Sequence, residues 1–263
     1  MPKSKLGLRK LKHSSPPKLQ YELLEHKLND LVGAEIKFTY TGQISCINCE
    51  RKIKKTFNQG YCYPCFQTLA RCDTCLVKPE LCHYSKGTCR EPKWGEEHCL
   101  IPHYVYLANT TGLKVGVTRG YQLFTRWGDQ GAISAVVLAK VPERLVAGEL
   151  EVAIKEHLND KTNWRKLLKG EFEELDLLTE KTNLLSKIPS EFKDYLILDG
   201  EESDVYGFQY PVESYLDKAK THNFDKTPVI EGILHGIHGQ YLFIGDAGLN
   251  IRKFQGYEVE FTY

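Results

Sequence analysis

The chain has 263 residues, of which 41% are hydrophobic and 26% are charged, a composition that is ordinary for a globular protein. No apolar run approaches the ~20 residues needed to cross a bilayer, and no apolar signal segment follows the basic residues 1–5. These features exclude a membrane-spanning protein, and we expect a cytoplasmic one.

The net charge of +1 hides an uneven distribution of charge along the chain. Residues 1–170 carry 27 Lys and Arg against 16 Asp and Glu, whereas residues 171–263 carry 8 against 18. The first part therefore has the charge of a protein that binds DNA or RNA. The acidic part is either a solvated surface or a segment that folds over the basic face and competes with nucleic acid. The second alternative predicts that cutting the chain near residue 170 raises the affinity for nucleic acid.

Residues 1–45 are predicted to form a mobile basic arm followed by a β segment. Pro16 and Pro17 interrupt regular structure in the arm. Residues 19–32 fit both a strand and a short helix, so both alternatives stay open. Ile36, Phe38 and Tyr40 alternate with polar residues, and this pattern predicts a strand.

All nine cysteines lie between Cys46 and Cys99, which defines a predicted metal-binding module over residues 46–100. The first four form two Cys-x2-Cys pairs with the spacing that surrounds a tetrahedral zinc ion: Cys46, Cys49, Cys62 and Cys65. Four thiolates leave no position for a water molecule, so we expect a structural ion. The basic residues 51–55 lie between the two pairs, which predicts a zinc-ribbon-like hairpin. Clustered thiols without a secretory signal favour metal binding over disulfides.

A second set of cysteines follows in the same module: Cys72, Cys75, Cys82 and Cys89. This set could hold a second zinc ion, and Cys99, His83 or His98 could replace one of its members. An iron–sulfur cluster is the alternative, because four cysteines that include one close pair also suit a [4Fe–4S] cluster. A single zinc ion is the simpler interpretation.

Residues 101–170 are predicted to form a small α/β unit, with a mixed sheet flanked by helices. Strands are expected at residues 104–107 and 113–117, on either side of a turn at Thr111 and Gly112. A short helix is expected at residues 122–127. Residues 133–141 have a continuous apolar centre, which is typical of a strand buried on both faces. A longer helix is expected to begin after Pro142 and to end near residue 158.

The remaining residues are predicted to divide into an acidic, partly helical segment (171–225) and a β segment (226–263). The last segment has short apolar runs separated by glycines, which favours a small barrel or sheet. Its strands could pair with those expected within residues 19–45. The fold class would then be α+β, with the cysteine module and the α/β unit inserted into one β domain.

Part of the chain, residues 103–168, resembles the GIY-YIG nuclease superfamily. The residues that carry the resemblance are the two motifs Tyr104-Val105-Tyr106 and Lys114-Val115-Gly116, followed by Arg126, Glu151 and Asn163. The whole chain also resembles an uncharacterised bacterial family of unknown function, which joins a cysteine cluster to segments like residues 112–119 and 160–164. This second resemblance brings no activity with it.

The resemblance to nucleases implies cleavage of phosphodiesters with a divalent metal ion. It implies that Glu151 holds Mg²⁺ or Mn²⁺ and that Arg126 binds the scissile phosphate. It further implies that Tyr106 orients or deprotonates the attacking water and that Asn163 braces the site. The alternative function is a non-catalytic zinc protein that binds nucleic acid or a protein partner through the same basic region.

Two positions leave the catalytic interpretation open. Lys114 stands where the motif has tyrosine; a lysine could bind phosphate, but it is a poor base unless burial lowers its pKa. Glu149 competes with Glu151, because either side chain could face inward from the expected helix.

Overall fold

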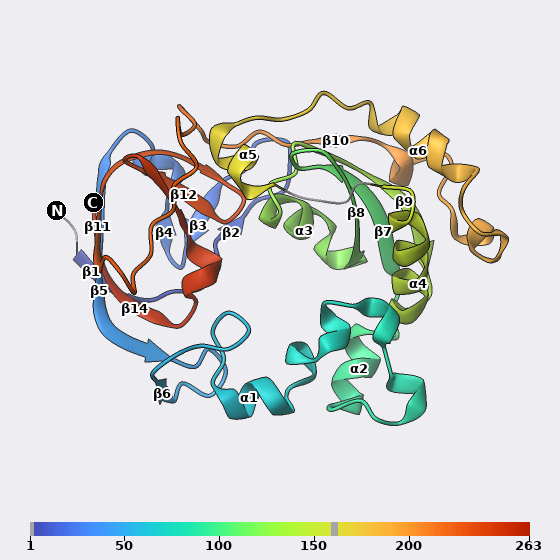
Figure 1. Ribbon diagram of the computed structural model, residues 1–263, viewed down its shortest axis with the longest axis horizontal. Coiled ribbons are helices and arrows are strands. Elements are labelled where there is room, and N and C mark those ends of the chain that lie inside the picture. Colours follow the sequence, from blue (N-terminus) through green and yellow to red (C-terminus); the bar gives the residue numbers. More distant parts are fainter. Residues whose placement is uncertain (1–2, 159–162) are drawn as a thin grey trace.

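The computed structural model describes residues 3–158 and 163–263, and in them the strands form three sheets (Figure 1). The largest sheet is centred on β5 (Glu35–Ser45), the longest strand, which lies between two strands from the far end of the chain. Its other strands are β1 (Lys3–Gly7), β14 (Tyr257–Thr262), β11 (Val229–His238), β12 (Tyr241–Ile244), β13 (Ala247–Asn250) and the short β6 (Lys52–Ile53). All of its strand pairs are antiparallel.

The central sheet joins the N-terminal and C-terminal parts of the sequence. Phe38 on β5 lies opposite Ile230 on β11 and Phe261 on β14, and the two phenyl rings stack with centroids 4.5 Å apart. The predicted pairing of the two terminal segments is therefore confirmed. The strands run in an open order within the described residues, so these segments form a sheet and not a closed barrel.

The first residues of the described chain are built into the fold. β1 pairs with β14, and Leu8 and Leu11 are completely buried, so residues 3–13 are not a mobile arm. In this stretch lysines are sequence neighbours of leucines that point into the core. Its composition is therefore basic, although its backbone forms strands. Residues 19–32 contain two short strands, β3 (Tyr21–Leu23) and β4 (His26–Lys27), and one 3₁₀ turn at Asn29–Leu31, but no α-helix. The two strands form a small sheet with the preceding β2 (Lys12–His13).

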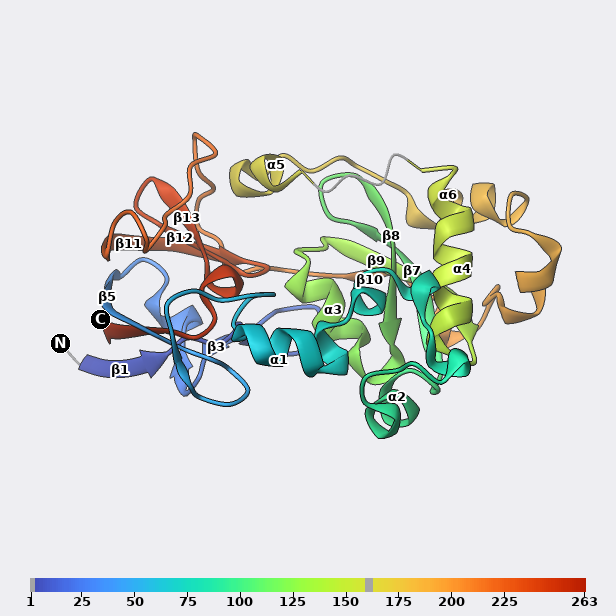
Figure 2. The ribbon, with the colours of Figure 1, turned by 60° about the horizontal axis from the view of Figure 1, so that its bottom comes forward.

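The cysteine module runs from the end of β5 to the beginning of the second large sheet, along the lower edge of Figure 1, and so bridges the two larger sheets (Figures 1 and 2). It consists of short elements: α1 (Tyr63–Thr68), α2 (Pro92–His98) and four 3₁₀ turns at Ala70–Cys72, Thr74–Leu76, Pro79–Leu81 and Tyr84–Lys86. The expected hairpin is reduced to the pairing of Ile44 and Ser45 with Ile53 and Lys52. Such short elements cannot bury much apolar surface, so the module needs other interactions to hold its shape.

The second large sheet has the strand order β10-β9-β7-β8. It contains β7 (His103–Asn109), β8 (Leu113–Arg119), β9 (Ser134–Val141) and β10 (Tyr206–Gly207). The sheet is antiparallel throughout, and the prediction of a mixed sheet is wrong. A tight turn reverses the chain between β7 and β8, and α3 (Leu123–Asp129) returns it so that β9 runs against β7.

The two faces of this second sheet pack against different parts of the protein. One face, with Val105 and Leu107, is covered by α4 (Arg144–Lys155) and α6 (Leu177–Leu185). The other face, with Tyr104 and Tyr106, packs with Trp127 of α3 into the same apolar core as the central sheet. The α/β unit and the terminal β segments therefore share one continuous core.

The acidic segment is an integral part of this structure. Leu177 and Leu184 of α6 are buried against the second sheet, and Phe208 and Phe224 are buried in the shared core. Removing everything after residue 170 would take these side chains away together with β11 and β14, the strands on either side of β5. Such a truncation would disrupt the fold, so it cannot test competition with nucleic acid. α5 (Trp164–Lys169) precedes the segment.

The longest helix described is α4, with 12 residues. Within residues 3–158 and 163–263, no helix has both the length and the apolar character that crossing a bilayer requires.

His238, at the end of β11, connects the central sheet to the α/β unit. Its ring stacks on Tyr210 with centroids 3.7 Å apart; Nε2 donates to the Gly131 carbonyl at 3.0 Å, and Nδ1 accepts from the Tyr215 hydroxyl at 3.0 Å. Burial lowers the pKa of His238 to about 4, because a charged imidazolium would lose its hydration in this buried site.

We predict that the free energy of unfolding falls as the pH is lowered from 6.5 towards 4. The unfolded chain takes up a proton on His238 near pH 6.5, whereas the folded protein takes it up only near pH 4, so acid favours the unfolded state by up to about 3 kcal/mol. Urea unfolding at several pH values measures this slope, and His238→Gln should reduce it. His235→Gln, a partly exposed position on the same strand, is the control. Equal slopes in the two variants would contradict the assignment.

Candidate metal centre and arginine cavity

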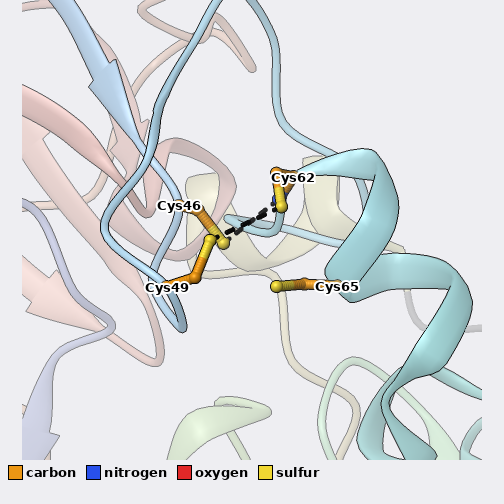
Figure 3. A group of neighbouring side chains, drawn as sticks. All are labelled: Cys46, Cys49, Cys62 and Cys65. Atoms are coloured by element: carbon orange, nitrogen blue, oxygen red, sulfur yellow. Dashed lines mark hydrogen bonds between the residues drawn. The ribbon is translucent and has the colours of Figure 1, made fainter.

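Cys46, Cys49, Cys62 and Cys65 converge on one point (Figure 3). Their sulfur atoms all lie within 4.8 Å of one another. Cys46 follows the last residue of β5, Cys49 lies in the turn after it, and the other two flank the beginning of α1. The predicted first set is thus brought together, and it could bind a metal such as zinc.

Two backbone turns hold these cysteines in place. The Cys46 amide donates to the Arg51 carbonyl at 2.9 Å, and the Glu50 amide donates to the Cys46 carbonyl at 2.9 Å. The Ile47 amide donates to the carbonyl of Gly60 at 2.9 Å. Gly60 has a φ of +127°, and a Cβ atom there would lie 2.8 Å from the Ile47 side chain, so only glycine suits this position.

Backbone amides also stabilise negative charge on the sulfur atoms. The Cys62 amide donates to Cys46 Sγ at 3.2 Å, and Cys49 Sγ lies 3.7 Å from Cys62 Sγ. Burial by itself would raise the pKa of Cys46, but the amides around Cys49, Cys62 and Asn48 outweigh it and lower this pKa to about 6. A thiolate is the form that binds zinc, so Cys46 favours the ligand form before any ion enters, whereas burial and the neighbouring thiols raise the pKa of Cys65 to about 12.

The second set of predicted ligands is not gathered in the same way. Among the described residues, the other group with ligand atoms within 4.8 Å of one another is Asp73, Cys75 and His83. Cys72 lies beside Asn58 instead, on the side of the first centre. All nine cysteines are free of disulfide bonds.

Tyr106, Arg126 and Glu151 of the nuclease-like motif lie near one another. Tyr106 is completely buried, and its hydroxyl lies 2.8 Å from the Gln130 amide. In the orientation that satisfies both neighbours, the Gln130 oxygen accepts from Nε and Nη2 of Arg126 at 3.2 Å. Gln130 therefore connects the side chains of Tyr106 and Arg126. No sequence motif pointed to Gln130. Burial raises the pKa of Tyr106; Arg126 opposes this shift and Glu151 adds to it.

Gly116 explains how the tyrosine fits against β8. It lies directly opposite Tyr106 in the sheet, and a Cβ atom there would be 2.5 Å from the Tyr106 hydroxyl. The tyrosine ring thus lies across the glycine backbone. This packing gives the glycine of the second motif a structural reason that does not depend on catalysis.

The two competing glutamates, Glu149 and Glu151, lie on different sides of α4. The Glu151 side chain is buried next to the sheet, and one of its oxygen atoms lies 3.2 Å from Nζ of Lys155. Glu149 is exposed on the outer side of the helix, beside Val152. Of the two, Glu151 is the one that adds to the raised pKa of Tyr106.

Lys114 and Asn163, the other two residues of the nuclease-like motif, lie on β8 and at the start of α5. Lys114 is on β8 opposite Ala108, two residues from Gly116 and so on the same face. Asn163 caps α5: its side-chain oxygen accepts from the backbone amide of Arg165 at 3.0 Å. Its backbone amide donates to the Thr111 hydroxyl at 3.0 Å. Asn163 thus lies at the turn end of the β7–β8 hairpin, in a different hollow from Arg126. Residues 160–162 of the second resemblance are outside the described residues.

A cavity of about 290 Å³ lies where the cysteine module, the α/β unit and the C-terminal β segment meet. We call it the arginine cavity. Its lining consists of Asn58, Arg71, Leu76, Val77, Val117, Thr118, Arg119, Gln122, Arg126, Arg144 and Arg252. The five arginines come from positions scattered over 180 residues, so no local motif could have revealed them.

The arginine cavity is strongly cationic. Its lining contains no carboxylate, and no ion pair joins any of the five arginines to a carboxylate within the described residues. Burial lowers the pKa of Arg144 and Arg252, yet guanidinium groups remain charged in proteins. Nη2 of Arg119 is buried without a hydrogen-bond partner in the described structure. Such a cavity attracts an anion.

One family model matches residues 33–259, and its description is "Protein of unknown function (DUF2797)". The chain belongs to this family. The match begins just before β5 and ends within β14, so it includes the cysteine module, the α/β unit and every residue that lines the arginine cavity. The resemblance to an uncharacterised family is confirmed, whereas its combination of a zinc module with a nuclease-like unit stays a prediction. No curated protein and no solved structure matches the chain.

We predict that Cys62→Ser abolishes metal binding at the first centre and lowers the free energy of unfolding by more than about 4 kcal/mol. The loss is large because the ion replaces the apolar core that the module lacks. Metal analysis and urea unfolding of the purified protein measure both effects. Ser45→Ala, which alters a neighbouring residue that is not a ligand, is the control. A variant that kept its metal and stability would contradict a structural ion.

Proposed function

We propose that this protein binds nucleic acid through the arginine cavity and that a zinc ion at the first centre holds the cysteine module against it. The observation that carries the proposal is the cluster of five arginines, none of which forms an ion pair with a carboxylate within the described residues. A phosphate group accepts paired hydrogen bonds from guanidinium and neutralises charges that otherwise repel one another. A cytoplasmic location, where thiols stay reduced, is consistent with nine cysteines that form no disulfide.

The size of the cavity favours one nucleotide unit rather than a duplex. Its volume of about 290 Å³ is at the lower end of the range for small-molecule sites. The exposed residues Arg51, Lys52, Lys54 and Lys55 of the same module offer further contacts to the phosphates of a continuing strand. We therefore favour single-stranded or locally unpaired nucleic acid.

The zinc ion has an indirect role in this proposal. Asn58 and Arg71 reach the cavity from the segments on either side of Cys62 and Cys65. The first centre fixes these segments, so the ion positions one wall of the cavity without contacting the ligand. Four thiolates complete its coordination and leave it no direct catalytic role.

We predict that affinity for labelled single-stranded DNA or RNA falls as the salt concentration rises. Arg126→Ala and Arg71→Ala should each lower the slope of log K against log salt by about 1, since each arginine releases roughly one counterion. Fluorescence anisotropy over a range of salt concentrations measures the slope. Arg165→Ala is the matched control, because this exposed arginine lies over Trp164 and outside the cavity. Absent or salt-independent binding would overturn the proposal and favour a protein partner.

A second candidate function is cleavage of the bound phosphodiester. Tyr106, Arg126 and Glu151 lie together, and Arg126 also lines the cavity, which favours this function. By the resemblance to GIY-YIG nucleases, Glu151 would hold Mg²⁺ or Mn²⁺, which would neutralise charge on the phosphate and activate a water. Arg126 would bind a phosphate oxygen. Tyr106 is neutral at pH 7 because burial raises its pKa, so in this site it would position the water rather than deprotonate it.

We predict that Glu151→Gln lowers the rate of metal-dependent cleavage by about 100-fold, since it removes the negative charge while keeping the shape of the side chain. Gel assays with labelled DNA and RNA in Mg²⁺ or Mn²⁺ measure the rate. Glu149→Gln on the outer side of α4 should leave it unchanged. If the unmodified protein cleaves neither substrate with either ion, catalysis is excluded and only binding remains.

A further inference from the structure

Five cysteines follow the first centre along the chain, and the structure separates Cys72 from the other four. Cys72 ends the 3₁₀ turn Ala70–Cys72 and is buried. Burial raises the pKa of its thiol, the Asn58 side chain opposes this shift, and Cys46 of the first centre adds to it to a smaller extent. Cys72 therefore faces the first centre.

The other four cysteines surround the N-terminus of α4. Arg144, the first residue of this helix, donates from its amide to the Cys99 carbonyl at 2.8 Å and from Nε to the Cys75 carbonyl at 3.2 Å. These two bonds hold the backbones of Cys75 and Cys99 against Arg144. Cys82 directly follows the 3₁₀ turn Pro79–Leu81, which packs so closely on α4 that a Cβ atom on Gly148 would clash with the backbone of Pro79 and Glu80.

α2 brings Cys89 to the same place. A Cβ atom on Gly95 of this helix would lie 3.3 Å from Cys89 Sγ, so the helix and this sulfur are in close contact. Cys99 ends α2, where its amide donates to the Gly95 carbonyl at 2.7 Å. The helix thus connects the two cysteines, and Cys89 is also an electrostatic neighbour of Cys99.

The charge of Arg144 points to an anion at this place. Its side chain is only 7% exposed, and its guanidinium donates to the carbonyls of Cys75 and Leu76. No carboxylate of the described residues forms an ion pair with it. A buried cation without a counter-charge is costly. A zinc ion with four thiolates carries a net charge of about −2 and would supply the missing negative charge.

The group Asp73, Cys75 and His83 is a weaker candidate, although its ligand atoms are already close together. Nε of Arg90 lies 2.7 Å from the Asp73 carboxylate, so a cation bound there would face a guanidinium group. Both ring nitrogens of His83 also have partners: Thr88 is 2.7 Å from Nδ1, and Asp73 is 3.4 Å from Nε2. These side chains satisfy one another without an ion.

We propose that Cys75, Cys82, Cys89 and Cys99 form a second zinc site and that Cys72 is not one of its ligands. The ion would bind beside Arg144, which also lines the arginine cavity. The four sulfur atoms are not gathered within 4.8 Å as those of the first centre are. The partly exposed segment that carries Cys82 and Cys89 consists of short turns and would close on the ion.

Metal analysis of the full chain, expressed with zinc and purified without chelator, tests the proposal. The unmodified protein should hold a second zinc ion in addition to the first. Cys99→Ser should lose that ion alone, Cys72→Ser should keep both, and Cys99→His, which restores a ligand atom, should recover it. Retention of the first ion and an unchanged circular dichroism spectrum show that Cys99→Ser is folded.

X-ray absorption of the unmodified zinc protein gives an independent reading of the ligands. Sulfur alone around the zinc supports the four-cysteine site, whereas nitrogen or oxygen ligands would overturn it in favour of His83 or Asp73. The proposal also fails if the unmodified protein holds a single zinc ion, if stoichiometric iron is found, or if Cys72→Ser loses an ion that Cys99→Ser keeps. None of these measurements involves nucleic acid, so their outcome is separate from that of the proposed function.

Discussion

The antiparallel pairing of β5 with β11 and β14 is the constraint on which the rest of the structure depends. It brings together segments that are about 200 residues apart, at a cost in chain entropy that the burial of Phe38 and Phe261 helps to offset. β5 then continues directly into Cys46. The strand therefore anchors both the shared core and the first metal centre, and everything between Cys46 and Val229 is arranged relative to it.

The shared core makes one unit of parts that look separate in the sequence. Gln240, next to β12, is an example: its side chain bonds the amide and the carbonyl of Leu11 and also reaches Asp129 of α3, at 2.8, 3.1 and 2.8 Å. The amide is 4% exposed, and each of its polar atoms has a partner, so its burial costs little. Such contacts fix the C-terminal segment against the α/β unit and hold Arg252 at the edge of the arginine cavity.

The arginine cavity lowers the stability of the folded protein. Burial lowers the pKa of Arg252; the carboxylate of Asp129 opposes this shift, and Arg126 adds to it to a smaller extent. Surfaces that bring like charges together without a carboxylate reduce stability unless an anion is bound. The metal centre, the shared core and the hydrogen bonds from guanidinium groups to carbonyls offset this repulsion. The fold therefore gathers five arginines around one cavity whose lining contains no carboxylate.

Local patterns in the sequence determined the grouping of Cys46, Cys49, Cys62 and Cys65, the strands on either side of the turn at residues 111–112, and the strand that contains residues 36–40. Each depends on spacing or alternation over a few residues, which steric and coordination rules translate directly into structure. The tertiary structure alone decided that residues 3–13 are packed, that the second sheet is antiparallel, and that Cys72 faces away from Cys75. It alone assembled five arginines from Arg71 to Arg252 around one cavity, because contacts between distant segments depend on how the whole chain packs and leave no periodic trace in the sequence.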